Sequence, residues 1–140
     1  MPGLVAYVIP ILLLRPGGQP PRFAGQIVAA GTGILLTCVR AFHVHGRGTL
    51  APWDPPRHLV RTGLYRYSRN PMYVGVLIVL SGWALSWPVA GLWIYAATIA
   101  LLFHLRIVLG EEPWLATTYG DEWIAYERCV PRWLGRRRCV

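Results

Sequence analysis

The chain has 140 residues, of which 54% are hydrophobic and only 14% are charged. This length allows one domain and hardly two, so a single domain over residues 1–140 is expected. Soluble domains carry roughly a quarter charged residues, and here the apolar residues form long blocks with the charges between them. The composition therefore excludes an ordinary soluble domain and indicates an integral membrane protein.

The basic residues are all arginine and give a net charge of +8. Such a charge is also found in nucleic-acid-binding proteins, but these arginines flank apolar blocks instead of forming one basic face. We therefore expect topology signals and contacts with membrane lipids, and no nucleic-acid partner. The cysteines and histidines show no spacing typical of a metal site, so no metal is expected.

The first apolar block, about residues 3–14, would be roughly 18 Å long as a helix. The apolar core of a bilayer is about 30 Å thick, and Pro10 interrupts the block. We therefore expect a tilted or partial span here.

The second block, about residues 24–44, is long enough to cross a membrane. Small residues recur every four positions along it: Gly25, Ala29, Gly33 and Thr37. Such a stripe lets another helix approach closely. The partner helix belongs either to the same chain or to a second copy.

A polar segment, about residues 45–70, separates the second block from a third, about 71–87. The fourth block, about 89–109, follows with only Trp87-Pro88 between. This predicts a tight helical hairpin over about 71–109. The expected fold is an all-α, polytopic membrane bundle of about four helices. The loop and the C-terminal tail, which contains one amphipathic helix around 117–130, would close a cofactor pocket.

Arginine is distributed unequally between the two sides of this bundle. The 45–70 loop and the tail share one side and hold most of the arginines, whereas the other side has only Arg15 and Arg22. The positive-inside rule therefore places the loop and the tail in the cytoplasm. We expect a multi-pass protein of a bacterial plasma membrane.

The stretch "SRNPMY" leads into the third apolar block. Asn70 is a good N-cap residue and Pro71 a good first residue of a helix. A helix N-terminus also presents unpaired N–H groups and a partial positive charge, which together with Arg69 would suit an anion. On these residues alone, a cap and a binding site are equal alternatives.

Glu111 and Glu112 are adjacent at the predicted end of the fourth helix, where Gly110 and Pro113 bracket them. Two carboxylates at a helix C-terminus oppose the macrodipole and repel each other. A cationic partner is therefore expected, either Arg106 or a positively charged ligand. The hairpin brings this acidic pair to the same side as "SRNPMY", so the pocket would suit a zwitterionic or sulfonium ligand such as S-adenosylmethionine.

Two segments of the chain, together with the hairpin between them, carry a family resemblance. "RHLVRTGLYRYSRNPMYVG" and "GEEPWLATTYGDEWIAYERCVPRWL" resemble the isoprenylcysteine carboxyl methyltransferase and phospholipid methyltransferase superfamily. Its members are integral membrane enzymes that use S-adenosylmethionine. The similarity covers roughly residues 50–135 and includes the order and spacing of three motifs.

The resemblance implies roles for particular positions. The cofactor-binding residues it implies are Arg57, His58, Leu59, Val60, Tyr65, Asn70, Pro71, Met72, Tyr73 and Glu111. Tyr119, Tyr126, Val130 and Pro131 match the family's tail. Asn70 stands where the family's Arg-His-Pro-x-Tyr motif has histidine, which removes any proton-transfer role from this position. Arg106 lies one residue out of register with the substrate-binding arginine of the carboxyl methyltransferases.

The preferred hypothesis is an S-adenosylmethionine-dependent methyltransferase acting on a lipophilic acceptor. Arg69 or Arg106 would anchor a carboxylate acceptor, such as an isoprenylcysteine-like group. Glu112 would be the base for a lipid amine, so Arg69 and Glu112 are the candidate catalytic residues. The alternatives are an NADPH-dependent membrane reductase of the sterol reductase type and a non-enzymatic membrane protein.

Overall fold

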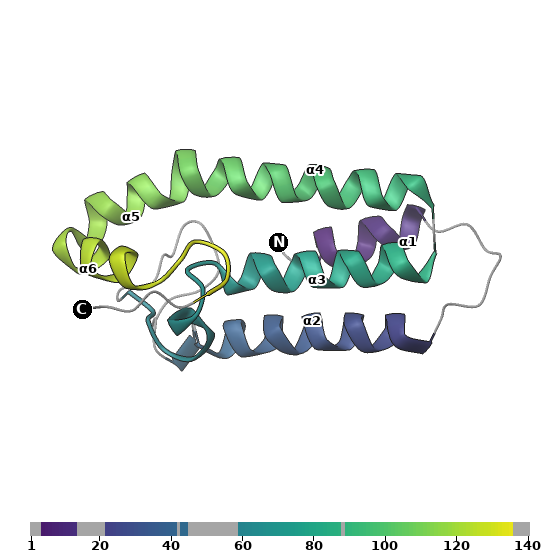
Figure 1. Cartoon of the computed structure of the whole chain (residues 1–140), viewed down its shortest axis with the longest axis horizontal. Coiled ribbons are helices and arrows are strands. Elements are labelled where there is room, and N and C mark those ends of the chain that lie inside the picture. The colour runs from purple at the N-terminus through teal and green to yellow at the C-terminus, as the bar shows by residue number, and fades with distance from the viewer. Residues whose placement is uncertain (1–3, 14–21, 42, 45–58, 88, 136–140) are drawn as a thin grey trace. The chain divides into compact units, whose positions relative to one another are not determined.

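The computed structural model describes residues 4–13, 22–41, 43–44, 59–87 and 89–135 (Figure 1). Within these ranges every regular element is a helix and none is a strand, which confirms the all-α prediction. Arg57 and His58, two of the expected cofactor ligands, lie outside the described residues.

The described elements occur along the chain in the following order. The N-terminal part holds the π-helical turn η1 (Leu4–Val8), α1 (Ile9–Leu13) and α2 (Arg22–Ala41). The 3-10 turn η3 (Gly63–Arg66) then precedes α3 (Pro71–Ser86) and α4 (Ala90–Arg106). The C-terminal part consists of the π-helical turn η4 (Ile107–Glu111), α5 (Glu112–Tyr119) and α6 (Asp121–Cys129).

These elements form two compact units. The helical unit consists of Met1–Ile34 and Met72–Leu105, and the loop–tail unit consists of Leu35–Pro71 and Arg106–Val140. In the helical unit, α3 ends at Ser86 and α4 begins at Ala90, with the two helices antiparallel (Figure 1). The Leu92 N–H donates to the carbonyl of Val89 and starts the new helix. The turn of the hairpin therefore falls where the sequence predicts it.

Close packing of α2 on α3 in the helical unit depends on two glycines. A Cβ atom added at Gly31 would lie 2.7 Å from Val79 Cγ2, and one added at Gly82 would lie 2.7 Å from Val28 Cγ2. Apart from its chain neighbours and the nearby backbone of its own helix, a Cβ added at Gly25 or Gly33 has no described heavy atom within 4 Å. The predicted stripe of small residues therefore does not form the contact between α2 and α3. That contact uses a neighbouring face of α2.

Replacing Gly31 by leucine should destabilise the helical unit by about 1–3 kcal/mol or more, because the side chain would collide with Val79 and with the Gly75 carbonyl oxygen 2.9 Å away. Thermal unfolding of the purified protein in detergent measures the effect. Gly25→Leu is the matched control and should change the unfolding temperature little. Equal effects of the two changes would show that Gly31 is not the contact position.

Two helical stretches are long and apolar enough to cross a membrane, Phe23–Ala41 and Ala90–Tyr119, and the shorter α3 is also apolar. Only 22% and 11% of their most apolar windows are buried within the protein. A core helix of a soluble protein would bury its apolar side chains, whereas these present them outward. This arrangement agrees with helices that face lipid.

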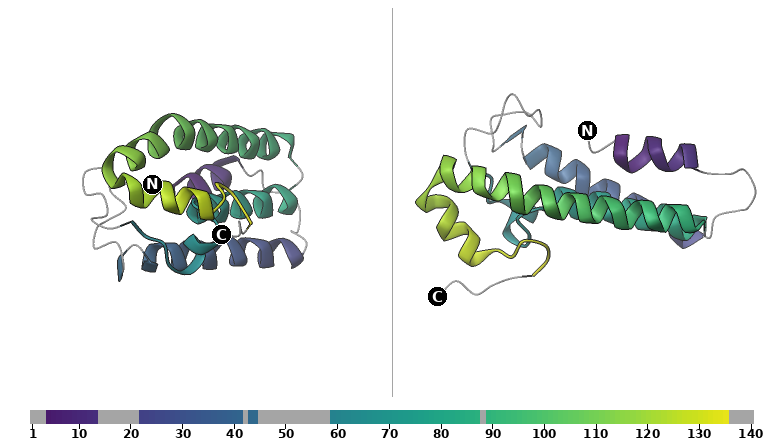
Figure 2. Two further views of the ribbon diagram at one scale, coloured as in Figure 1. Left: turned by 60° about the vertical axis from the view of Figure 1, so that its left-hand side comes forward. Right: turned by 90° about the horizontal axis from the view of Figure 1, so that it is seen from above.

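The fourth helix does not end near residue 109, so the predicted boundary is wrong. Figures 1 and 2 show α4, η4 and α5 as one uninterrupted ribbon. The Glu112 N–H donates to the carbonyl of Ile107, a wide π-type turn, and Pro113 falls in the first turn of α5. Proline has no N–H to donate, and the first turn of a helix tolerates that loss. Glu111 and Glu112 thus lie inside a continuous helix, and the macrodipole argument for them fails.

The predicted tail helix around 117–130 is also divided. Gly120 has φ +51° and separates α5 from α6, which begins at Asp121. Glycine adopts this left-handed backbone without the steric cost that a side chain brings. The chain therefore turns back at Gly120, and α6 becomes a separate element of the loop–tail unit.

Candidate active site

The segment before α3 is held in a tight turn of the loop–tail unit. Gly63, with φ +62°, opens the 3-10 turn, and the Ser68 N–H donates to the carbonyl of Leu64. The buried Ser68 hydroxyl accepts the Asn70 N–H at 3.0 Å. The helix then begins at Pro71, as the sequence predicts. Arg69 is consequently fixed between two residues whose backbone is already bound.

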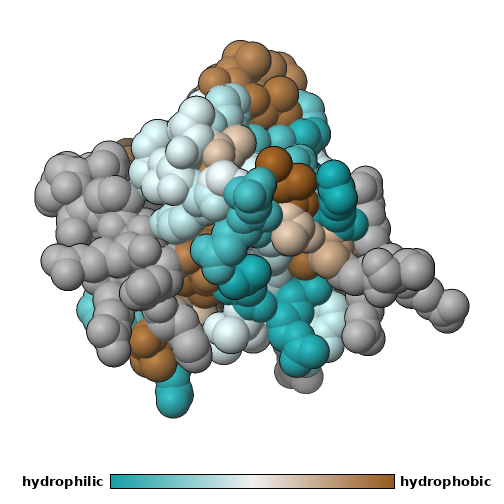
Figure 3. All heavy atoms as spheres, turned by 90° about the vertical axis from the view of Figure 1, so that its left-hand side faces the viewer, coloured by the Kyte–Doolittle hydropathy of each residue, from teal (hydrophilic) through white to brown (hydrophobic). Residues whose placement is uncertain are grey.

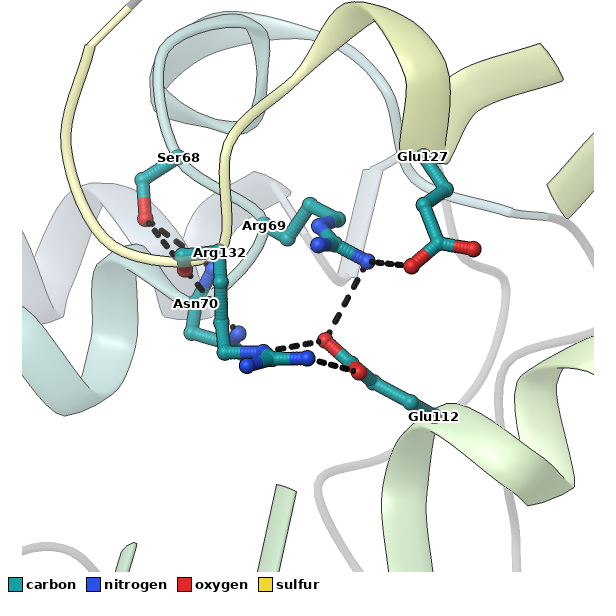
Figure 4. A network of polar contacts seen from close by, with 6 residues as sticks. All are labelled: Ser68, Arg69, Asn70, Glu112, Glu127 and Arg132. Carbon is teal, nitrogen blue, oxygen red and sulfur yellow. Dashed lines mark hydrogen bonds and ion pairs between the residues drawn. The ribbon is translucent and has the colours of Figure 1, made fainter. Parts of the chain in front are cut away.

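Four charged side chains converge beside this turn and are termed the polar network: Arg69, Glu112, Glu127 and Arg132 (Figure 4). Arg69 Nη1 lies 2.8 Å from Glu127 Oε1 and 3.1 Å from Glu112 Oε1. Arg132 binds Glu112 with two parallel hydrogen bonds, Nε to Oε1 at 2.8 Å and Nη2 to Oε2 at 2.7 Å. Bidentate charged pairs of this kind are stronger and more directional than single contacts. The Glu112 carboxylate therefore pairs with two guanidinium groups at once, those of Arg69 and Arg132.

Arg69 is the most enclosed member of the network, with 6% of its side chain exposed. Its guanidinium lies 5.4 Å from the centre of the Trp123 ring, a cation–π contact. Its Nε is buried and has no hydrogen-bond partner among the described residues. A buried donor without a partner is costly, so this N–H needs an acceptor that the described residues do not supply.

The residues after α6, Val130 to Trp133, form a strap across the turn. Three contacts from residues 68–70 hold its main chain. The Arg69 N–H donates to the Pro131 carbonyl at 3.0 Å, and the Arg132 carbonyl accepts from Asn70 Nδ2 at 3.1 Å and from the Ser68 hydroxyl at 3.5 Å. Asn70 thus uses its side-chain amide to hold the tail, and proton transfer plays no part in this role.

Aromatic packing supports the strap from α6. Trp123, Tyr126 and Val130 form a buried cluster, against which Leu59 and Tyr119 pack. The Tyr126 hydroxyl donates to the Tyr65 carbonyl at 2.7 Å. Leu59 and the tail residues named by the resemblance are therefore part of the scaffold that closes the site.

A cavity of about 410 Å³ lies in the same unit. It is lined by Thr37, Cys38, Ala41, Gly63, Leu64, Tyr65, Arg66 and Tyr67. Burial is the main cause that raises the pKa of Tyr65, the neighbouring Cys38 is the next, and Tyr126 and Glu111 add smaller contributions. Tyr65 is therefore a neutral hydroxyl in an apolar setting, within electrostatic reach of Glu111.

The two adjacent glutamates have different partners. Glu111 Oε1 accepts from Arg106 Nε at 2.8 Å, in a pair whose arginine side chain is 63% exposed. Glu112 turns instead to Arg69 and Arg132. The sequence offered Arg106 or a ligand as the cationic partner, and the structure confirms Arg106 for Glu111 alone.

The remaining predicted residues are not members of the polar network. Val60 is buried. Met72 and Tyr73 belong to the helical unit, where the Tyr73 ring packs on Phe103 with centroids 4.4 Å apart. Sequence reasoning assigned no role to Ser68, Glu127 or Arg132, although all three lie in the stretches that it singled out.

Outward-facing apolar helices and a charged network where the third helix begins define the chain as a helical membrane protein with a candidate ligand site. The family model for phospholipid methyltransferase matches residues 22–122. The chain belongs to this family, within the superfamily of membrane methyltransferases that also contains the isoprenylcysteine enzymes. No curated protein and no solved structure matches it.

Membership identifies the chain as a membrane-associated methyltransferase of a family with lipid-related substrates, and it implies a methyl donor. It also favours methyl transfer over the reductase and the non-enzymatic hypotheses. The matched range includes Arg69 and Glu112 but ends before Glu127 and Arg132. Half of the polar network therefore lies outside the part that the family model describes.

Tyr126→Phe should lower stability by about 1–3 kcal/mol, because the buried Tyr65 carbonyl loses its donor. Burial raises the pKa of Tyr126, so the folded protein keeps this proton while the unfolded chain loses it near pH 10. The contribution is present below about pH 10 and is lost as the pH rises further. Unfolding measured at about pH 8 and about pH 11 should show a smaller alkaline loss in Tyr126→Phe than in wild type. Equal alkaline losses would contradict this account.

Proposed function

We propose that the chain transfers a methyl group from S-adenosylmethionine to a lipid-linked acceptor at the membrane surface. The observation that carries this proposal is the buried Arg69–Glu112 pair with the unpartnered Arg69 Nε. Both residues lie in the range matched by the methyltransferase family model.

The residues present fit the proposed donor. S-adenosylmethionine carries a carboxylate, an ammonium and a sulfonium, and it supplies a methyl group already activated on sulfur. Arg69 would hold the carboxylate through its unpartnered Nε, and Glu112 would hold the ammonium. Tyr65 and its cavity of about 410 Å³ offer an apolar recess, within the usual size range of small-molecule sites.

The chain's own contribution is positioning, which is the main demand of a displacement at an activated carbon. Because Arg69 holds the donor carboxylate in this proposal, Arg106 would anchor an anionic acceptor. An amine acceptor must also lose a proton, and Glu112, the base expected from the sequence, is engaged with the donor ammonium in this proposal. Because Arg132 occupies both oxygens of Glu112, binding of that ammonium requires Arg132 to move away first.

The length of the fourth helix supports a site at the level of the lipid headgroups. From Ala90 to Glu112 the continuous helix rises about 33 Å, and the apolar core of a bilayer is about 30 Å thick. The face that carries α5 and α6 gathers hydrophilic side chains (Figure 3). A lipid acceptor would reach this level from the bilayer, while the donor would enter from the cytoplasm.

The direct test is incubation of purified protein with a bacterial lipid extract and methyl-labelled S-adenosylmethionine. We expect label in a lipid-soluble product, detected by mass spectrometry and absent with Arg69→Gln. Mild alkali separates the acceptors, because it hydrolyses a methyl ester and leaves an N-methyl group intact. Bound donor without any labelled product across several extracts would overturn the proposed reaction.

A further inference from the structure

Arg132 covers the carboxylate that the proposed donor would need. It engages both oxygens of Glu112, at 2.8 and 2.7 Å. Arg69 approaches only Oε1 of the same carboxylate. A ligand ammonium therefore cannot form a full contact with Glu112 while Arg132 remains in place.

The side chain of Arg132 is free to leave without the strap opening. Its backbone carbonyl is held by Asn70 and Ser68, and the neighbouring Pro131 carbonyl is held by the Arg69 N–H. None of these contacts uses the guanidinium. The Arg132 side chain is also 33% exposed, against 6% for Arg69. One guanidinium is thus fixed and the other lies next to solvent.

The net charge of the polar network would change if the Arg132 side chain moved away. The carboxylates of Glu112 and Glu127 are matched by Arg69 and Arg132, so the network is neutral as it stands. Withdrawal of Arg132 would leave an excess negative charge beside a buried arginine. The ammonium group of a ligand would restore the cation at Glu112, and S-adenosylmethionine carries such a group.

We propose that Arg132 is a placeholder. Its guanidinium occupies the cation position on Glu112 in the empty site, and the ammonium group of the donor displaces it. The identity of the ligand rests on the proposed function, whereas the covering of Glu112 by Arg132 does not. The placeholder keeps Glu112 paired between turnovers and lowers the affinity for any ligand that cannot replace its charge.

The first test needs no ligand. Water-soluble carbodiimide with an amine nucleophile labels accessible carboxylates, and peptide mapping gives the rate at Glu112. Arg132→Gln should be labelled there several-fold faster than wild type. Arg128→Gln removes an exposed arginine of α6 and should leave the rate unchanged. An equal rate in Arg132→Gln and wild type would overturn the covering role.

The second test is calorimetric titration with S-adenosylhomocysteine, which keeps the ammonium and the carboxylate. Arg132→Gln should bind it about three- to tenfold more tightly, since a partly exposed competing ion pair is gone. Arg132→Lys keeps the charge but loses the bidentate geometry, so its affinity should lie between those of wild type and Arg132→Gln. This variant replaces Arg132→Gln in the test if Arg132→Gln does not fold. Weaker binding by both variants would show instead that Arg132 belongs to the ligand site, and the proposal would fail.

The two tests separate the two claims. If neither wild type nor Arg132→Gln binds S-adenosylhomocysteine, the proposed donor is wrong and displacement by it is excluded. The labelling ratio at Glu112 then still decides whether Arg132 covers this carboxylate.

Discussion

Arg69→Gln is expected to abolish donor binding and to destabilise the loop–tail unit by about 3–5 kcal/mol, since it removes one partner from a buried ion pair. Glu112 and Glu127 would then face each other with only Arg132 to compensate them. The cation–π contact with Trp123 would be lost as well. Thermal unfolding and titration with S-adenosylhomocysteine measure the two effects separately.

Arg61→Gln is the matched control for this change. Arg61 also pairs with a glutamate of α6, Glu122, but the side chains are 45% and 53% exposed. Exposed pairs contribute about 0–1 kcal/mol, so this variant should unfold and bind ligand nearly as wild type does. A fully active Arg69→Gln protein would contradict the site described above.

Glu112→Gln is expected to weaken binding of S-adenosylhomocysteine by about 30- to 100-fold, because a charge-assisted contact to the ligand ammonium is lost. The change keeps the shape of the side chain and removes only its charge. It also leaves Arg69 and Arg132 without their shared carboxylate, so some loss of stability should accompany it. Calorimetric titration measures the affinity, once circular dichroism has shown that the variant is folded to the same extent as wild type.

Glu122→Gln controls for the loss of a carboxylate in the same unit and should bind ligand as wild type does. Glu111→Gln should show a smaller loss than Glu112→Gln, because Glu111 pairs with the exposed Arg106 and its charge contributes only a small part of the pKa rise of Tyr65. A larger loss in Glu111→Gln would reassign the ammonium contact to Glu111.

Two local features of this fold could be predicted from the sequence. Asn70-Pro71 predicted the start of α3, and Trp87-Pro88 predicted the hairpin turn, because capping and proline rules act over a few residues. Arg69 and Glu112 stood out because unpaired charges next to apolar blocks need an explanation. Both residues belong to the polar network.

Most of the features that escaped prediction depend on contacts between distant segments. Arg132 pairs with Glu112 from 20 residues away, and Arg69 pairs with Glu127 across 58. The face of α2 that packs is set by Val79 and Gly75 of α3, so a stripe of small residues could not identify it alone. Gly110 and Pro113 look like a helix end, yet a single π-type turn lets the helix continue.

The most direct measurement is calorimetric titration of the purified wild-type protein in detergent with S-adenosylhomocysteine, beside Arg69→Gln and Arg61→Gln. The account predicts saturable binding by wild type and Arg61→Gln and none by Arg69→Gln. Absence of binding by a folded wild-type protein, or equal binding by all three, would contradict it.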